Sequence, residues 1–172
     1  MAVQVAKLLG AGRVVGAGRD VARLNVLTDL GADEIVQLTE DPDTTSGALA
    51  QAAAEVDIVI DYLWGKPAEQ AIMALLTARS DRSKALNWIQ IGAMAGPTLE
   101  LPSVALRSAN LRIQGNGQGA VSTRVYLAEL PSLVDEIDRG TLEINARPVR
   151  LADVEEAWSA SEPPGLRRVL VP

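Results

Sequence analysis

The 172-residue sequence predicts an α/β domain in which helices alternate with the strands of a parallel sheet. Two stretches, LLGAGRVVGAG (8–18) and DLGADEIVQLT (29–39), each place Gly-Ala between a helix end and an apolar strand. A helix, glycine and strand repeated at this spacing are typical of βα units. The short apolar run VDIVID (56–61) adds a third observation, because strands of this kind are buried on both faces of a parallel sheet.

The same alternation continues to about residue 140 and predicts each element in turn. Apolar residues at three-residue spacing, as in 20–30, predict helices, and a proline at position 67 suits the first turn of another. A polar loop is expected at 40–47. We expect helices at 1–9, 20–30, 44–54, 67–78 and 121–140, and strands within 13–18, 34–39, 56–61, 85–96 and 111–119, the last two running into glycine-containing loops.

The character of the sequence changes after residue 140. A short strand at 142–149, a short helix at 151–158 and a strand at 167–172 follow, with the breaker Pro-Pro-Gly at 163–165. These elements are too small to enclose a core of their own, so they need another surface to pack on. We therefore predict an incomplete cofactor-binding domain at 1–140 and a separate C-terminal segment at 141–172.

Composition excludes several classes of chemistry. The chain has no Cys and no His, so disulfides, the usual zinc ligand sets and histidine-based nucleophile pairs are impossible, and we expect no metal site. The net charge of −6 argues against a nucleic-acid surface. A transmembrane-length apolar stretch and a signal-peptide pattern are both lacking, so we expect a cytoplasmic protein with no membrane partner.

The stretch RVVGAGRDVA (13–22) is the first candidate binding segment, and its residues allow two interpretations. In one, Gly16 and Gly18 belong to a phosphate-binding glycine loop, although the third glycine of that motif is absent. In the other, the segment is the second strand of the fold, Gly16 to Arg19 bind a ribose, and the opening helix follows a glycine loop outside this sequence. The repeated helix-glycine-strand pattern favours the second.

Two arginines at the end of this segment bear on which cofactor would bind. A carboxylate at the strand end would accept the ribose hydroxyls and select NAD, but Gly18 has none. Arg19 and Arg23 stand one helical turn apart on one helix face, and two guanidiniums there suit a ribose 2′-phosphate, which favours NADP. The simpler alternative is that both are ordinary solvated helix charges.

A resemblance to a known family covers nearly the whole chain. The stretches AVQVAKLLGAGRVVGAGRD, LGADEIVQL, VDIVIDYLWG, WIQIGAMAG and LRIQGNG stand in this order before the ending PVRLADVEEAW…RRVLVP. Together they resemble the C-terminal part of the medium-chain dehydrogenase/reductase family, above all its zinc-free quinone oxidoreductase-like branch. The resemblance implies a Rossmann-like parallel sheet with helices on both faces, NADPH as hydride donor, and reduction of a quinone, enone or other carbonyl substrate.

Two parts of the family pattern have no counterpart in this sequence. Members begin with a catalytic domain, followed by the strand and glycine-rich loop that open the cofactor domain. We therefore expect an N-terminally truncated chain that lacks that strand and loop, with residues 141–172 belonging to an absent catalytic domain. Such a chain would be a weak or inactive enzyme.

The resemblance also implies which residues surround the cofactor. In open α/β sheets, ligands bind outside the carboxyl ends of the strands, where all these residues lie. The implied set is Gly16, Gly18, Arg19 and Arg23 around the ribose and its phosphate; Asp61, Tyr62 and Leu63 on a central strand; Ile91, Gly92, Ala93 and Met94, with backbone groups for the nicotinamide carboxamide; and Gly115 and Asn116 at the nicotinamide end.

Catalytic residues stay unassigned. Asp61 as a base or Tyr62 as an acid would be one interpretation, but a carboxylate that caps its own loop is the simpler one. Members of the family often dimerise through the edge strand that corresponds to 111–116, so the resemblance implies a homodimer. The alternative function is a non-catalytic, degenerate piece that acts in oligomerisation or partner binding. A methyltransferase-like domain would require an acidic second-strand end, which GAGR lacks.

Overall fold

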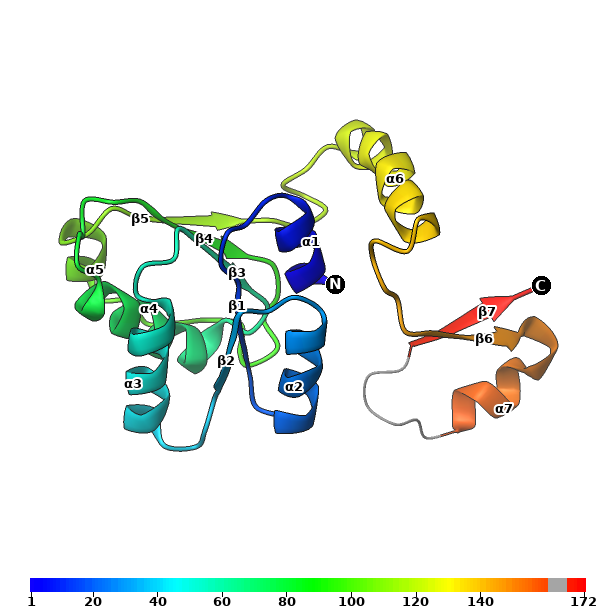
Figure 1. Ribbon diagram of the computed structural model, residues 1–172, viewed down its shortest axis with the longest axis horizontal. Helices are drawn as coiled ribbons and strands as arrows, with labels where there is room; N and C mark the ends of the chain where they lie inside the picture. The colour runs from blue at the N-terminus through cyan, green and yellow to red at the C-terminus, as the bar shows by residue number, and fades with distance from the viewer. Residues whose placement is uncertain (161–166) are drawn as a thin grey trace.

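The computed structural model describes residues 1–160 and 167–172, so the break predicted at 163–165 lies outside the described residues. Helices and strands alternate along the chain as the sequence predicts (Figure 1). Their bounds are α1 Ala2–Leu8, β1 Val15–Gly18, α2 Val21–Asp29, β2 Glu34–Gln37, α3 Pro42–Ala53, β3 Ile58–Asp61, α4 Gly65–Ala78, β4 Leu86–Gln90, α5 Ser103–Arg107, β5 Leu111–Gly115, α6 Thr123–Asp138, β6 Ala146–Arg150, the 3₁₀-helix η1 Leu151–Asp153, α7 Val154–Ser159 and β7 Arg167–Val171.

Every strand pair in the described residues is parallel, but the strands do not form one continuous sheet. The hydrogen-bonded orders are β1–β2, β3–β4–β5 and β6–β7. Within the described part of the chain, no backbone hydrogen bond joins β1 to β3. The predicted parallel α/β fold is therefore confirmed, in a form where its main sheet is divided into a pair and a triplet of strands.

Helices cover both faces of the first pair of strands. Gly16 is buried against α2, where an added Cβ would lie 2.7 Å from the Leu27 side chain. Side chains alternate between the faces of a strand, so Val15 points the other way, and it packs on the core cluster that includes Leu49 of α3. The helices on both faces that the family resemblance implies are thus present.

One apolar core joins the two parts of the main sheet. It lies under α3 and α4, which pack on each other and carry most of its residues. Val36 of β2 belongs to the same cluster as Ile72 of α4 and Trp88 of β4, and the last two are fully buried. Side-chain packing, which is non-directional, therefore holds together the two sets of strands that hydrogen bonding leaves apart.

Two helices begin earlier than the sequence predicts, and one short helix is not predicted. α3 begins at Pro42, two residues before the expected Thr44, because the Asp41 carboxylate caps the helix by accepting from Asp43 N and Thr44 N. Those bonds favour the charged carboxylate, and the hydrogen bond from the Thr44 hydroxyl does so most, so the pKa of Asp41 lies below its usual value. α4 begins at Gly65 instead of 67, and α5 was not expected at all.

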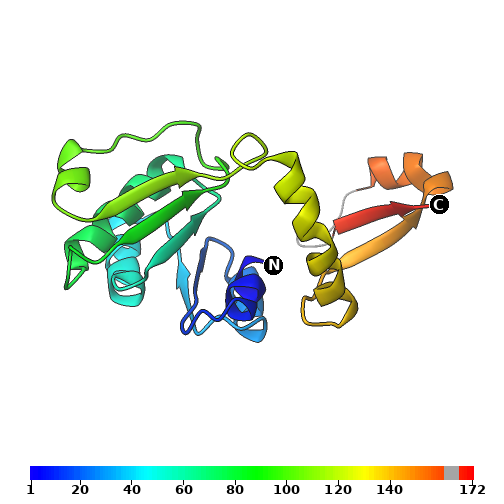
Figure 2. The same cartoon turned by 90° about the horizontal axis from the view of Figure 1, so that it is seen from above.

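The last fifty residues contain the elements that the sequence predicts after residue 140. β6 and β7 form a parallel pair with η1 and α7 between them. α6 buries no residue, and Figure 2 shows it standing between the β3–β5 strands and the β6–β7 pair. In the described residues, no helix has the length and apolarity needed to cross a membrane.

One pair of hydrogen bonds attaches this C-terminal part to α1. The Gln4 amide donates to Glu143 O at 3.2 Å and accepts from Glu143 N at 2.7 Å. Gln4 is buried, and so is the neighbouring Leu142. The division at residue 140 stays a prediction, and this contact is one place where the two predicted parts meet.

The buried Arg79 joins three elements at the amino end of the strands. Its Nη1 donates to Ala54 O at 2.7 Å and Val56 O at 2.8 Å, and its Nη2 donates to Ala85 O at 3.2 Å. These carbonyls end α3 and precede β3 and β4. Within the described residues its Nε is a buried side-chain atom without a partner, so Arg79 is held at some cost in desolvation.

Replacing Arg79 should destabilise the chain strongly. Arg79→Ala leaves buried carbonyls without donors and opens a void, so the free energy of unfolding should fall by about 2–4 kcal/mol. Urea denaturation followed by far-UV circular dichroism measures the loss. Arg82→Ala is the matched control, because Arg82 is exposed and should matter by no more than about 0.5 kcal/mol. Equal losses for the two variants would contradict the role given to Arg79.

Candidate functional site

The loops that follow β3 and β4 are bound tightly to each other. Ile91 N and Gly92 N donate to Asp61 O at 2.8 and 3.2 Å. Met94 N donates to Tyr62 O at 3.2 Å, and Ala95 N donates to Leu63 O at 2.8 Å. The structure therefore brings the predicted residues 61–63 and 91–94 into one cluster at the carboxyl ends of these strands.

Asp61 serves the loop instead of presenting a free carboxylate. Its Oδ1 accepts from Leu63 N at 2.8 Å and from Trp64 N at 3.0 Å, and its Oδ2 accepts from the indole Nε1 of Trp88 at 2.9 Å. The side chain is buried. A carboxylate whose oxygens are all engaged inside the protein orders its surroundings, so the geometry agrees with the capping interpretation of Asp61.

The contact between the two loops requires glycine at two positions. A Cβ on Gly92 would lie 2.9 Å from Tyr62 O, and one on Gly65 would lie 3.1 Å from Ala95 O. Gly65 also has φ +57°, and Trp64 before it has φ 54°, a left-handed conformation that costs energy for a side chain of its size. The hydrogen bonds that Leu63 N and Trp64 N donate to Asp61 hold Trp64 in this conformation.

Hydrogen bonds inside the protein reduce the number of backbone amides that the loop after β4 can donate to a ligand. Three of the four amides predicted to meet the carboxamide, those of Ile91, Gly92 and Met94, already donate to loop carbonyls. In the described residues, the Ala93 amide is the one member of this set without an acceptor. The Ala93 side chain is exposed, as is that of Met94.

Gly115 and Asn116 lie next to this cluster. Asn116 N donates to Gln90 O at 2.8 Å, and the Gln90 side-chain amide donates to Gly92 O at 3.0 Å. The end of β5 is therefore tied through Gln90 to the loop after β4. Both predicted residues are exposed, and in the described residues the Asn116 side chain has no hydrogen-bond partner.

The remaining predicted residues form a second cluster on β1 and the start of α2. Asp20 caps α2 by accepting from Arg23 N at 3.2 Å, and its carboxylate lies 3.7 Å from the Arg23 guanidinium. Arg19 is exposed, and its guanidinium makes no ion pair or hydrogen bond in the described part of the chain. Gly16 packs against Leu27 and Gly18 packs against Leu24 of α2. The close approach of this helix to β1 therefore accounts for both glycines.

The two clusters occupy separate sets of strands. No hydrogen bond or ion pair in the described residues connects the group at Gly16 to Arg23 with the group at 61–63, 91–94 and 115–116. The structure thus assembles the predicted site in two halves, each at the carboxyl end of its own strands.

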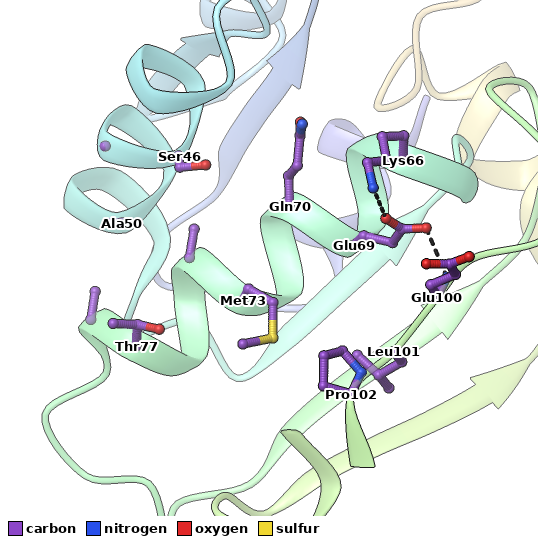
Figure 3. Close-up of a pocket in the computed structure, with 13 residues that line it drawn as sticks. Ser46, Ala50, Lys66, Glu69, Gln70, Met73, Thr77, Glu100, Leu101 and Pro102 are labelled. Carbon is purple, nitrogen blue, oxygen red and sulfur yellow. Dashed lines mark hydrogen bonds and ion pairs between the residues drawn. The ribbon is translucent and has the colours of Figure 1, made fainter. Parts of the chain in front are cut away.

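A groove on the outer side of α3 and α4 was not predicted from the sequence. Figure 3 shows it between these helices and the segment at 100–102, with Met73 and Leu101 among its apolar residues. Lys66 Nζ lies 2.7 Å from Glu69 Oε2, and this bond, helped by Glu100 N donating to Glu69 Oε1, lowers the pKa of the Glu69 carboxyl. Charges paired in this way stabilise α4 and the segment at 100–102. No sequence motif marks the groove.

These features define the class of protein. Parallel strands with loops converging at their carboxyl ends and helices on both faces are the architecture of nucleotide-binding α/β domains. The particular family follows from comparison: the model of the family described as zinc-binding dehydrogenase matches residues 1–119, and the chain belongs to this family. The resemblance to medium-chain dehydrogenases/reductases is thereby confirmed.

A curated relative extends the match over the whole chain. The protein named probable NADPH-dependent quinone reductase tdiC, from Emericella nidulans, is 28% identical over 185 aligned positions, which include 99% of this chain and 50% of the relative. The chain therefore spans about half the length of the curated relative that it matches.

Solved structures share the fold. A putative zinc-binding dehydrogenase from Sinorhizobium meliloti 1021, bound to NADP, has a TM-score of 0.72 and 19% identity, with 99% of this chain and 48% of that chain covered. A mycobacterial protein complexed with NADPH has a TM-score of 0.66 and 20% identity, with 90% and 46% covered. Both chains again extend well beyond the part that this chain matches.

The contact of Gly92 with Tyr62 O can be tested by adding one methyl group. Gly92→Ala should push the loops after β3 and β4 apart and lower the free energy of unfolding by about 1–3 kcal/mol. Gly117→Ala is the control, because a Cβ there meets no atom within 4 Å. Thermal melts of both variants measure the difference, and a Gly92→Ala protein as stable as the control would refute this close packing.

Proposed function

We propose that this chain is the NADP-binding portion of an oxidoreductase that reduces a quinone, an enone or another carbonyl compound. The observation that carries the proposal is the match along the whole chain to a protein named as a probable NADPH-dependent quinone reductase. The fold supports it, since the candidate residues lie at strand ends where this architecture binds ligands. Because the chain spans about half of that relative, the proposed activity of this chain alone is weak or absent.

The residues on β1 and α2 fit a phosphorylated ribose in part. Arg19 offers an exposed guanidinium that has no partner among residues 1–160 and 167–172, which suits a 2′-phosphate. Arg23 already faces Asp20, so its charge is partly compensated. We therefore assign the phosphate mainly to Arg19, with Arg23 as a weaker second contact, and Gly16 and Gly18 shape the strand end.

In the other half of the site, at 61–63, 91–94 and 115–116, few polar groups are left to bind a carboxamide. Of the amides at 91–94, that of Ala93 has no acceptor in the described residues and could donate to the ligand. Asn116 contributes an exposed side-chain amide. Gly92 allows the loop to lie close to Tyr62 and Leu63, while Asp61 holds both loops in place. Bound NADPH would supply the hydride, and these residues would orient it. We propose no metal ligand in this chain, which has neither Cys nor His.

An assembly role is the second candidate, and a specific observation favours it. α6 exposes Val125, Tyr126 and Val134, and Trp158 of α7 is 88% exposed. Large apolar side chains gathered on unburied helices are typical of surfaces that another polypeptide covers. A non-catalytic partner-binding module would use these surfaces without any cofactor. For either function we propose a cytoplasmic location.

We further propose a homodimer through the outer edge of β5. Leu86 N donates to Asn110 O and Asn116 N donates to Gln90 O, so the backbones of Leu111, Ile113 and Gly115 point away from β4. Pairing of two such edges would satisfy both. Sedimentation equilibrium should find a dimer that Ile113→Pro dissociates, whereas a concentration-independent monomer would exclude it.

Cofactor binding is tested by titrating the chain with NADPH and NADH and following nicotinamide fluorescence. We expect NADPH to bind more tightly, and Arg19→Ala to weaken NADPH by about tenfold or more while leaving NADH nearly unchanged, because one charge-assisted contact is lost. Arg124→Ala on α6 is the control, an exposed arginine far along the chain from β1. Equal affinity for both cofactors would refute the role of Arg19, and no binding at millimolar NADPH would favour the assembly function.

A further inference from the structure

The segment that leads from β5 to α6 begins with the pair Asn116-Gly117 (Figure 2). The sequence has five asparagines, and Asn116 is the one that a glycine follows. The side-chain carbonyl carbon of an asparagine, Cγ, is electrophilic, and the backbone nitrogen of the next residue can close a five-membered ring on it. Glycine leaves that nitrogen unhindered, because it has no Cβ and permits nearly every backbone rotation.

Both groups that would react are accessible. Asn116 and Gly117 are exposed, and in the described part of the chain neither the Asn116 side chain nor Gly117 N makes a hydrogen bond. A Cβ built on Gly115 or Gly117 would meet no atom within 4 Å, so there is open space on both sides of Asn116. Asn116 N donates to Gln90 O at 2.8 Å, but this nitrogen is not a member of the ring, so ring closure leaves the bond intact.

The other asparagines are restrained where this one is not. The side-chain amides of Asn87 and Asn110 donate to backbone carbonyls at 3.3 and 3.0 Å. After Asn145 the next backbone amide, Ala146 N, donates to a carbonyl at 2.9 Å. Asn25 lies inside α2, where the helical backbone fixes the amide that follows it. Among residues 1–160 and 167–172, the pair after β5 alone combines an unrestrained side chain with an unrestrained amide.

We propose that Asn116 is a site of spontaneous deamidation in the folded chain. Gly117 N gives up its proton to a base in the solvent and attacks Cγ of Asn116. The N–Cγ bond forms and the Cγ–Nδ2 bond breaks, so Nδ2 takes up a proton and leaves as ammonia, and a cyclic imide remains. Water then opens the ring. In sum, one side-chain amide and one water give one carboxylate and one ammonium ion, and nothing is oxidised or reduced.

Water opens the imide in two ways. Cleavage of the new N–Cγ bond restores the main chain and leaves an aspartate, whereas cleavage of the main-chain amide bond leaves an isoaspartate, whose backbone is longer by one methylene. Either product carries a negative charge directly after β5, beside the backbone of Gln90. Under the proposed function this carboxylate replaces the side-chain amide assigned to the carboxamide, but the deamidation itself does not rest on that function.

The test incubates the full chain at neutral and at mildly alkaline pH and follows its tryptic peptides by tandem mass spectrometry. The peptide 113–124 should gain about 1 Da at Asn116, in two forms that chromatography separates, aspartate and isoaspartate. The rate should rise with pH, because the attacking nitrogen must lose its proton. The peptides that contain Asn110 and Asn145 are controls within the same digest, and they should react at least about tenfold more slowly.

A matched variant isolates the contribution of the glycine. Gly117→Ala adds a methyl group beside the attacking nitrogen, and its Cβ meets no atom within 4 Å, so the fold should be unchanged. Deamidation of Asn116 should slow by about tenfold or more, and circular dichroism confirms that the variant folds. An equal rate in this variant, aspartate formed without isoaspartate, or an Asn116 that reacts in urea but stays intact in the folded chain would each overturn the proposal.

Discussion

The apolar layer of α3 and α4 is the constraint on which the rest of this fold depends. Hydrogen bonding joins β1 to β2 and β3 to β4 and β5, but it does not join these two sets to each other in the described residues. Val36 of β2 and Trp88 of β4 come from the two sets of strands, Ile72 comes from α4, and all three are buried in one cluster. Burial of that cluster places the two halves of the candidate site on a single body, so the relative position of these halves rests on side-chain packing.

In the second half of the site, the loop after β4 uses most of its backbone amides for hydrogen bonds inside the protein, although these amides were expected to bind a ligand. Donors in Ile91, Gly92 and Met94 bind the carbonyls of Asp61 and Tyr62, which makes the loops rigid and leaves few free amides. Rigidity of this kind positions the remaining groups well but reduces their number. Under the proposed function, recognition of the cofactor here would depend on shape and on a small number of contacts, and the charged contact would come from Arg19 after β1.

The order of helices and strands was predictable from the sequence because each depends on local periodicity and on glycine at helix ends. α5 was missed because five residues give too short a period to recognise, and the start of α3 was placed late although Asp41 and Pro42 form a good helix start. The positions of the candidate residues at strand ends followed from strand order. The sequence could not show which of their polar groups are already hydrogen-bonded inside the protein. The hydrogen bond between Asp61 and Trp88 and the packing of Gly16 on Leu27 depend on tertiary contacts.

The amide pairing of Gln4 with Glu143 has a consequence for the order of events in folding. Its two partners are 139 positions apart, so the contact closes nearly the whole chain into a loop, and loop closure of that length costs entropy that local contacts do not. During synthesis Gln4 of α1 leaves the ribosome before residue 143 and has no partner until that residue follows. The attachment of the last segment is therefore a late step, formed after the strands and helices between the two residues have found their places.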